Sequence, residues 1–193
     1  MTSILVFSGS TRPASLNQRL ADVAAQRLAG MGVTVTALSL ADHALPFADD
    51  DGRADPPFAA RALTSQVLEH DGLFIACPEY NSGYPALLKN ALDWVSMVRK
   101  DGPGLAGKVV ALGAASPGAR GGYRALTQFR TMLELGFGAL VIPDMASVPF
   151  ANKVLPAEGG LTDEGASKFL DATLKRLVLE CRRSAAVPRL EGL

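Results

Sequence analysis

The chain has 193 residues, of which 48% are hydrophobic and 20% charged, with 19 basic and 19 acidic side chains. This length predicts one domain with a full core, and a net charge of zero argues against nucleic acid or an anionic membrane surface as a partner. The chain has two cysteines, which lie far apart in the sequence, so we do not expect a disulfide framework. It has two histidines without the spacing of metal ligands, so we do not expect a zinc site. No apolar stretch approaches about 18 residues and no signal pattern opens the chain, so we expect a cytoplasmic protein without a membrane span.

Five apolar runs predict strands, at 3–8, 32–40, 72–78, 108–116 and 138–144. Apolar residues at helical spacing predict helices over 15–30, 57–70, 85–99, 122–135 and 163–182. The stretches 42–57 and 143–162 are expected to be irregular. This alternation predicts an α/β fold, a doubly wound five-stranded parallel sheet with helices on both faces. It would span residues 1–185 as a single domain, with a flexible tail over 186–193.

The strand order stays open at this point between 3-2-1-4-5 and 2-1-3-4-5. In either order, ligands bind beyond the carboxyl ends of the strands. The loops 9–17, 78–84 and 116–122 each follow a strand, so we expect them to meet there and to form one site.

The first of these loops contains no acidic residue. A strand-to-helix loop gathers unpaired N–H groups, and the helix dipole adds roughly half a positive charge, so such a place binds anions. The side chains that could add donors for a phosphate are Ser10, Thr11, Arg12, Ser15 and Asn17. The pattern predicts a cradle for one phosphate group, and the plainer alternative is a helix cap at Ser15.

Two other phosphate motifs are poorly supported. The dinucleotide fingerprint G-x-G-x-x-G is missing after the first strand, and no acid ends the second strand. The stretch GPGLAGKV at 102–109 is similar to a Walker A loop, but Val109 replaces the required hydroxyl residue and a strand follows where a helix is needed.

The second loop, PEYNSGYP, combines prolines and a glycine with two tyrosines and polar side chains. Such a wall suits a flat heteroaromatic ring with polar edge atoms, although a plain turn with exposed tyrosines is the simpler alternative. The third loop, SPGARGGYR, is glycine-rich and would allow a ligand close to the backbone. A phosphate cradle beside a ring wall predicts a mononucleotide whose ring performs the chemistry, which points to FMN.

The stretches GSTRPASLN and PEYNSGYPALLKNALDW resemble the NADPH-dependent FMN reductase family. This flavodoxin-like family includes quinone and chromate reductases and azoreductase-like relatives. The family patterns G-S-x-R-x-x-S-x-N and P-E-Y-N-x-S/G-x-P-x-x-L-K-N-x-I/L-D-W are matched at both places. The third loop is similar to the family stretch S-x-G-x-x-G-G, and the resemblance runs from about residue 3 to residue 145.

The resemblance implies the flavodoxin-like order 2-1-3-4-5 and noncovalently bound FMN. It places the phosphate on Ser10, Arg12, Ser15 and Asn17, with Thr11 and Leu16 in the same loop. It places the ring along Pro78, Glu79, Tyr80, Asn81 and Ser82, near Ser116, Gly118 and Gly121. It also implies a homodimer, or a dimer of dimers, with the helix over 84–99 and the loop 43–52 in the contact. Trp94 on this helix belongs either to that contact or to the core.

The expected reaction is hydride transfer from NADPH to N5 of the flavin, followed by two-electron reduction of a small acceptor. Main-chain N–H groups of the 79–82 loop would stabilise the negative charge that develops on the ring. The Glu79 side chain either anchors this loop or leaves ring contact to its backbone, and we favour the second because a carboxylate would oppose an anionic ring. Arg120 and Arg124 are candidates to bind the 2′-phosphate of NADPH.

The acceptor could be a quinone, free flavin, chromate or an azo compound. Three other functions compete with a reductase. A flavodoxin-type electron carrier tends to be strongly acidic, which this chain is not. A redox-sensing FMN module is compatible with the sequence, whereas a flavin-free phosphate enzyme lacks a nucleophile in the first loop.

Overall fold

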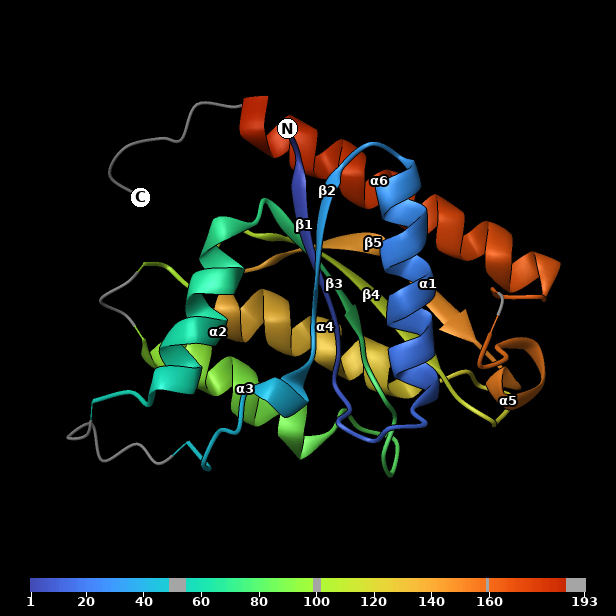
Figure 1. Cartoon of the computed structure of the whole chain (residues 1–193), viewed down its shortest axis with the longest axis horizontal. Coiled ribbons are helices and arrows are strands. Elements are labelled where there is room, and N and C mark those ends of the chain that lie inside the picture. Colours follow the sequence, from blue (N-terminus) through green and yellow to red (C-terminus); the bar gives the residue numbers. More distant parts are fainter. Residues whose placement is uncertain (49–54, 99–101, 159, 187–193) are drawn as a thin grey trace.

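The computed structural model describes residues 1–48, 55–98, 102–158 and 160–186. Its sheet has parallel strands in the order β2-β1-β3-β4-β5, which confirms the predicted fold and decides between the two orders (Figure 1). The strands are β1 (Ser3–Ser8), β2 (Thr34–Leu38), β3 (Gly72–Ala76), β4 (Val109–Ala115) and β5 (Leu140–Val148).

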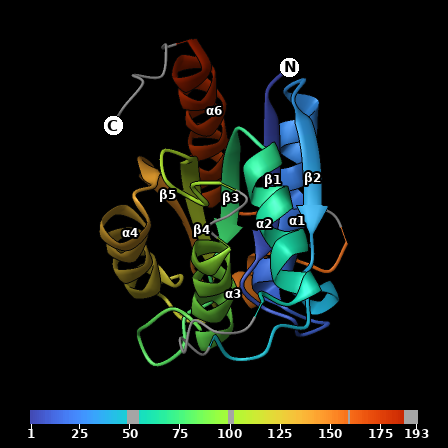
Figure 2. The ribbon, with the colours of Figure 1, turned by 90° about the vertical axis from the view of Figure 1, so that its left-hand side faces the viewer.

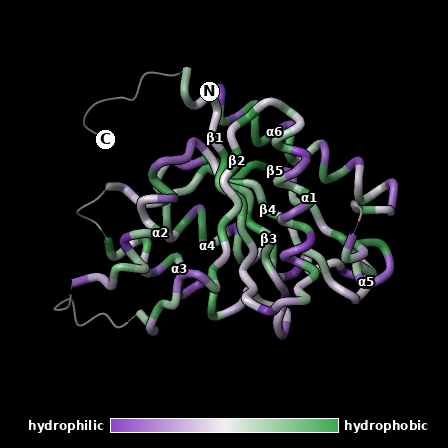
Figure 3. Tube along the Cα trace, viewed as in Figure 1, coloured by the Kyte–Doolittle hydropathy of each residue, from purple (hydrophilic) through white to green (hydrophobic). Residues whose placement is uncertain are grey.

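Helices cover both faces of this sheet, as predicted (Figure 2). On one face lie α1 (Leu16–Gly30) and α6 (Glu164–Ala186), and on the other lie α2 (Phe58–Glu69), α3 (Ala86–Met97) and α4 (Tyr123–Phe137). Successive side chains of a strand point to opposite faces, so Ile4 and Val6 pack with the first group while Leu5 and Phe7 pack with the second. Because both faces are covered, the inner strands β1, β3 and β4 are mostly apolar and almost entirely buried, and Figure 3 shows this hydrophobic centre of the molecule.

The stretch 143–162 was expected to be irregular, and this prediction was wrong in part. The strand β5 continues to Val148, and a short helix α5 (Ala151–Val154) follows it. Proline lacks an N–H for the ladder, and the pairing jumps from Val141 to Met145 across a bulge that contains Pro143. The Arg130 guanidinium donates to three carbonyl groups at this bulge, those of Val141, Ile142 and Pro143. The sequence pattern stops at the bulge, but the strand does not.

The remaining differences are small. A 3-10 turn η1 (Leu40–Asp42) follows β2, and the rest of the predicted loop 42–57 is irregular where the structure describes it. Residues 49–54 of that loop and residue 99 of the third predicted helix lie outside the described residues. In the predicted tail 186–193, Ala186 ends α6 and residues 187–193 lie outside the described part. Among the described helices, none has the length and apolarity needed to cross a membrane.

Candidate functional site

The three predicted loops meet at the carboxyl edge of the sheet. The first loop packs directly on the second, because a methyl group at Gly9 would lie 2.9 Å from Leu88 and 3.1 Å from Pro78. Gly9 N–H also donates to the carbonyl of Ala76 at the end of β3, at 2.9 Å. The side chain of Gln128 on α4, the helix after the third loop, donates to the carbonyl of Ser82 in the second loop at 2.9 Å. Parallel strands therefore bring together residues that lie far apart in the sequence, such as Gly9 and Pro78.

The first loop is rich in unused donors. Among the described residues, five main-chain N–H groups around the start of α1 donate no hydrogen bond, those of Ser10, Thr11, Ala14, Leu16 and Asn17. The Arg12 side chain is exposed and makes no hydrogen bond or ion pair within the described chain. Because the helix dipole adds positive potential at the same place, the loop has the chemistry of an anion site.

Ser15 caps α1, as the plainer alternative proposed. Its hydroxyl oxygen accepts a hydrogen bond from Gln18 N–H at 3.3 Å, and its side chain is buried. A hydroxyl group that accepts one bond still has a proton to donate. The cap and a phosphate contact are therefore compatible at this residue.

The Asn17 side chain is already engaged inside the protein. Its Nδ2 donates to the Ala115 carbonyl at 3.0 Å, and its Oδ1 accepts from Ala115 N–H at 2.9 Å. This buried pair of bonds fastens the first turn of α1 to the end of β4. The side chain thus positions the loop, and the donor of Asn17 that stays unused is its main-chain N–H.

The second loop folds into a two-residue hairpin under strain. Tyr80 and Gly83 exchange N–H···O bonds of 2.9 Å, and the residues between them, Asn81 and Ser82, have φ values of 49° and 68°. Positive φ is uncommon for residues other than glycine, and it recurs at functional sites. Within the described structure the N–H groups of Glu79, Asn81 and Ser82 have no acceptor, so they are available to a ligand.

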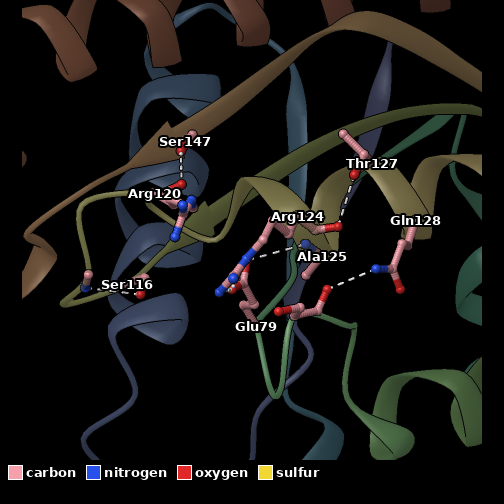
Figure 4. A network of polar contacts seen from close by, with 10 residues as sticks. Glu79, Ser116, Arg120, Arg124, Ala125, Thr127, Gln128 and Ser147 are labelled. Carbon is pink, nitrogen blue, oxygen red and sulfur yellow. Dashed lines mark hydrogen bonds and ion pairs between the residues drawn. The ribbon is translucent and has the colours of Figure 1, made fainter.

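The Glu79 side chain anchors this loop, which is the alternative that we did not favour from the sequence, and contact of the Glu79 backbone with the ring stays a prediction. Its carboxylate forms an ion pair with Arg124, whose Nε donates at 2.9 Å, and accepts from Ala125 N–H at 3.3 Å (Figure 4). Burial by itself raises the pKa of Glu79, but these hydrogen bonds and the charge of Arg124 outweigh it and hold the pKa below its usual value. The pair ties the second loop to the start of α4.

The glycines of the third loop have different roles. A methyl group at Gly121, where φ is +55°, would lie 2.3 Å from Ser147 Oγ, and one at Gly122, where φ is +85°, would lie 2.6 Å from the Ala114 Cβ. Both glycines are required by the packing of the protein itself, and contact of the Gly121 backbone with the flavin stays a prediction. Gly118 is different, because a methyl group there would meet only Ser116 Oγ, at 3.6 Å.

An open cavity of about 390 Å³ lies between the second and third loops. The residues that line it are Glu79, Ser116, Gly118, Ala119, Arg120, Gly122 and Arg124. Ligand pockets of proteins typically measure about 300–1,000 Å³. The cavity thus joins the predicted ring wall to the glycine-rich loop.

Comparison with known proteins now identifies the family. The model of the NADPH-dependent FMN reductase family matches residues 2–153. The chain belongs to this family. It is similar to a quinone reductase from Escherichia coli K12, with 35% identity over 174 residues, 89% of this chain and 90% of that protein. It is also similar to an NAD(P)H-dependent FMN reductase from Pseudomonas aeruginosa, with 33% identity over 184 residues, 93% of this chain and 95% of that protein.

Among solved structures, the fold matches the flavoenzyme NAD(P)H:(acceptor) oxidoreductase FerB from Paracoccus denitrificans. The TM-score is 0.79 at 29% identity, over 95% of this chain and 99% of that one. As a member of the family, the protein is an oxidoreductase that uses FMN with NAD(P)H as the reductant.

The residues of the first loop fit the phosphate of FMN. The loop has five free N–H groups and the unpaired Arg12, and it contains no competing carboxylate. Next to them, at the end of β1, the hydroxyl of Ser8 is buried and has no hydrogen-bond partner among the described residues. A buried polar group without a partner is rare and costs free energy. Sequence reasoning missed Ser8, because it closes an apolar run and was counted as the last strand residue.

Proposed function

We propose that this chain is an NADPH-dependent, FMN-containing reductase that passes two electrons to a quinone-type acceptor. The observation that carries the proposal is an acid-free, donor-rich first loop at the same edge of the sheet as an open cavity between the second and third loops. The similarity to a protein named quinone reductase favours quinones over free flavin, chromate and azo compounds as acceptors. The bound flavin supplies the redox chemistry, since its N5 takes hydride from NADPH and its ring then gives two electrons to the acceptor.

The protein holds and orients the cofactor in this proposal. The phosphate is bound by the N–H groups at the start of α1, including that of Leu16, and by the side chains of Ser10, Thr11, Arg12 and Ser15. The free N–H groups of the 79–82 loop contact the polar edge of the ring and stabilise the negative charge that it gains on reduction. Main-chain donors suit this task because their positions are fixed before the reaction begins.

The Glu79–Arg124 pair keeps the second loop in place. Because Arg124 neutralises the charge of the Glu79 carboxylate, this carboxylate does not oppose the anionic ring as an isolated charge would. Pro78 and Tyr80 complete this wall, and Ser116 and Gly118 border the cavity on the other side.

An anaerobic titration of FMN-loaded protein with NADPH tests the proposal. We expect the visible flavin band to bleach at about one equivalent of NADPH, because hydride transfer moves two electrons at once. Addition of a quinone should restore the band, and chromate, free flavin and an azo dye provide comparison acceptors. FMN and NADPH mixed without protein are the control. A bound flavin that stays oxidised would contradict the reductase and favour an electron carrier or a redox-sensing module.

We also propose that the protein forms a homodimer, or a dimer of dimers, through α3 and the loop 43–52. Asn90 and Trp94 on α3 hold the segment 46–48, as the Trp94 indole donates to the Pro46 carbonyl at 2.8 Å. Trp94 itself is buried, whereas Phe47 is 84% exposed and Leu87 on α3 is 38% exposed. Residues 49–52 of the proposed contact lie outside the described residues. Light scattering should give at least twice the chain mass of 20.2 kDa, and Phe47→Asp should lower it.

A further inference from the structure

The cavity between the second and third loops carries one positive charge that no described residue neutralises. Its ionisable lining residues are Glu79, Arg120 and Arg124. Glu79 and Arg124 form an ion pair. The guanidinium of Arg120 makes no hydrogen bond or ion pair with any described residue, and Figure 4 shows a contact only at its main-chain oxygen. Of the two arginines that the sequence offered for a second phosphate, one is therefore already used and the other is available.

The backbone that carries Arg120 is held firmly. Its carbonyl accepts from Ser147 Oγ at 3.2 Å and from Tyr123 N–H at 3.0 Å. The next residue, Gly121, leaves no room for even a methyl group against Ser147. Because the backbone beneath it is already fixed, only the side chain itself has to be ordered when the guanidinium binds a ligand.

We propose that Arg120 binds the 2′-phosphate of NADPH and thereby makes the enzyme prefer NADPH to NADH; this inference rests on the proposed function. The guanidinium fork binds terminal phosphate oxygens in pairs. The phosphate of FMN is assigned to the first loop, so a phosphate at Arg120 belongs to a different ligand. The pyrophosphate is common to both coenzymes, whereas the 2′-phosphate is a monoester with a charge of about −1.5 to −2 and three acceptor oxygens on one phosphorus, more than either phosphorus of the pyrophosphate carries. Arg120 is exposed at the cavity rim, which suits the outer end of a dinucleotide better than its reacting ring.

The test compares the wild type with Arg120→Gln and with the control Arg182→Gln. Arg182 is exposed on α6, and its side chain has no partner in the described structure. We expect Arg120→Gln to lower kcat/KM for NADPH about tenfold, or about 1.4 kcal/mol, and to leave kcat/KM for NADH and the urea midpoint unchanged. Arg182→Gln should change none of these values.

A binding measurement without turnover supplies the second readout. In calorimetric titrations, Arg120→Gln should weaken the binding of 2′,5′-ADP about tenfold, or about 1.4 kcal/mol. The binding of 5′-AMP should not change. An equal loss of kcat/KM for NADPH and NADH would overturn the proposal in favour of a pyrophosphate contact. Unchanged kcat/KM values for both coenzymes would overturn it outright. If wild-type flavin is reduced by neither coenzyme, the proposed function itself fails; if it is reduced and the ratio does not move, only the role of Arg120 fails.

Discussion

The side chain of Asn17 distinguishes a residue that builds the site from one that binds the cofactor. Replacing it with alanine removes two hydrogen bonds to Ala115, of 3.0 and 2.9 Å. Both Asn17 and Ala115 are buried, at 4% exposure each, so the N–H and the carbonyl of Ala115 would lose their partners away from bulk water. Each such loss costs about 1–3 kcal/mol. The Asn17→Ala variant should therefore lower the free energy of unfolding by about 2–6 kcal/mol in total.

The assay is urea-induced unfolding of the FMN-free protein, followed by fluorescence of Trp94, the only tryptophan. Leaving out FMN is essential, because a bound ligand adds its own stabilisation. The matched control is Gln18→Ala, which removes an exposed bond of 2.9 Å to Asp22 one position further along the same helix. This control should change the unfolding free energy by less than about 0.5 kcal/mol.

One result would refute the reasoning. If Asn17→Ala unfolds at the same urea concentration as the FMN-free wild type but binds FMN much more weakly, the side chain is a phosphate ligand after all. Loss of stability without FMN, at any FMN affinity, supports the structural role.

Three further predictions concern the loops and the core. Arg12→Ala should weaken the binding of FMN by about 1.5–3 kcal/mol, as a fluorescence titration can measure. Urea unfolding of the FMN-free protein should not change. An unaltered FMN affinity would contradict the assignment of Arg12 to the phosphate. Because the pKa of Glu79 is lowered in the folded state, its pair with Arg124 stabilises at neutral pH and this contribution disappears as the pH falls through that pKa. Glu79→Gln should cost about 1 kcal/mol at neutral pH, since Arg124 is half exposed, and almost nothing in acid, as acid and urea unfolding can show. Burial raises the pKa of both thiols, that of Cys181 to about 12, so Cys77 and Cys181 should react with a thiol reagent only after denaturation; fast reaction of the native protein would contradict their burial.

The sequence alone determined the class of fold and the place of the site. Continuous apolar strands between amphipathic helices require a sheet covered on both faces, and parallel strands bring their following loops to one edge whichever order they take. The acid-free first loop and the PEYN loop were therefore assigned to one site without knowledge of their contacts. These conclusions hold because they depend on local periodicity and on the direction of the strands.

Only the tertiary structure decided which partner each polar side chain has. Asn17 bonds a residue 98 positions away, and Glu79 pairs with an arginine 45 positions away. A local pattern shows that a side chain can donate or accept, but packing of distant elements decides whether a ligand or the protein uses that capacity. The same reason explains why Gly118 and Gly121 look alike in the sequence, while the second is pressed against Ser147 and the first is open. It also explains why Arg124 is engaged in an ion pair and Arg120 is available to a ligand.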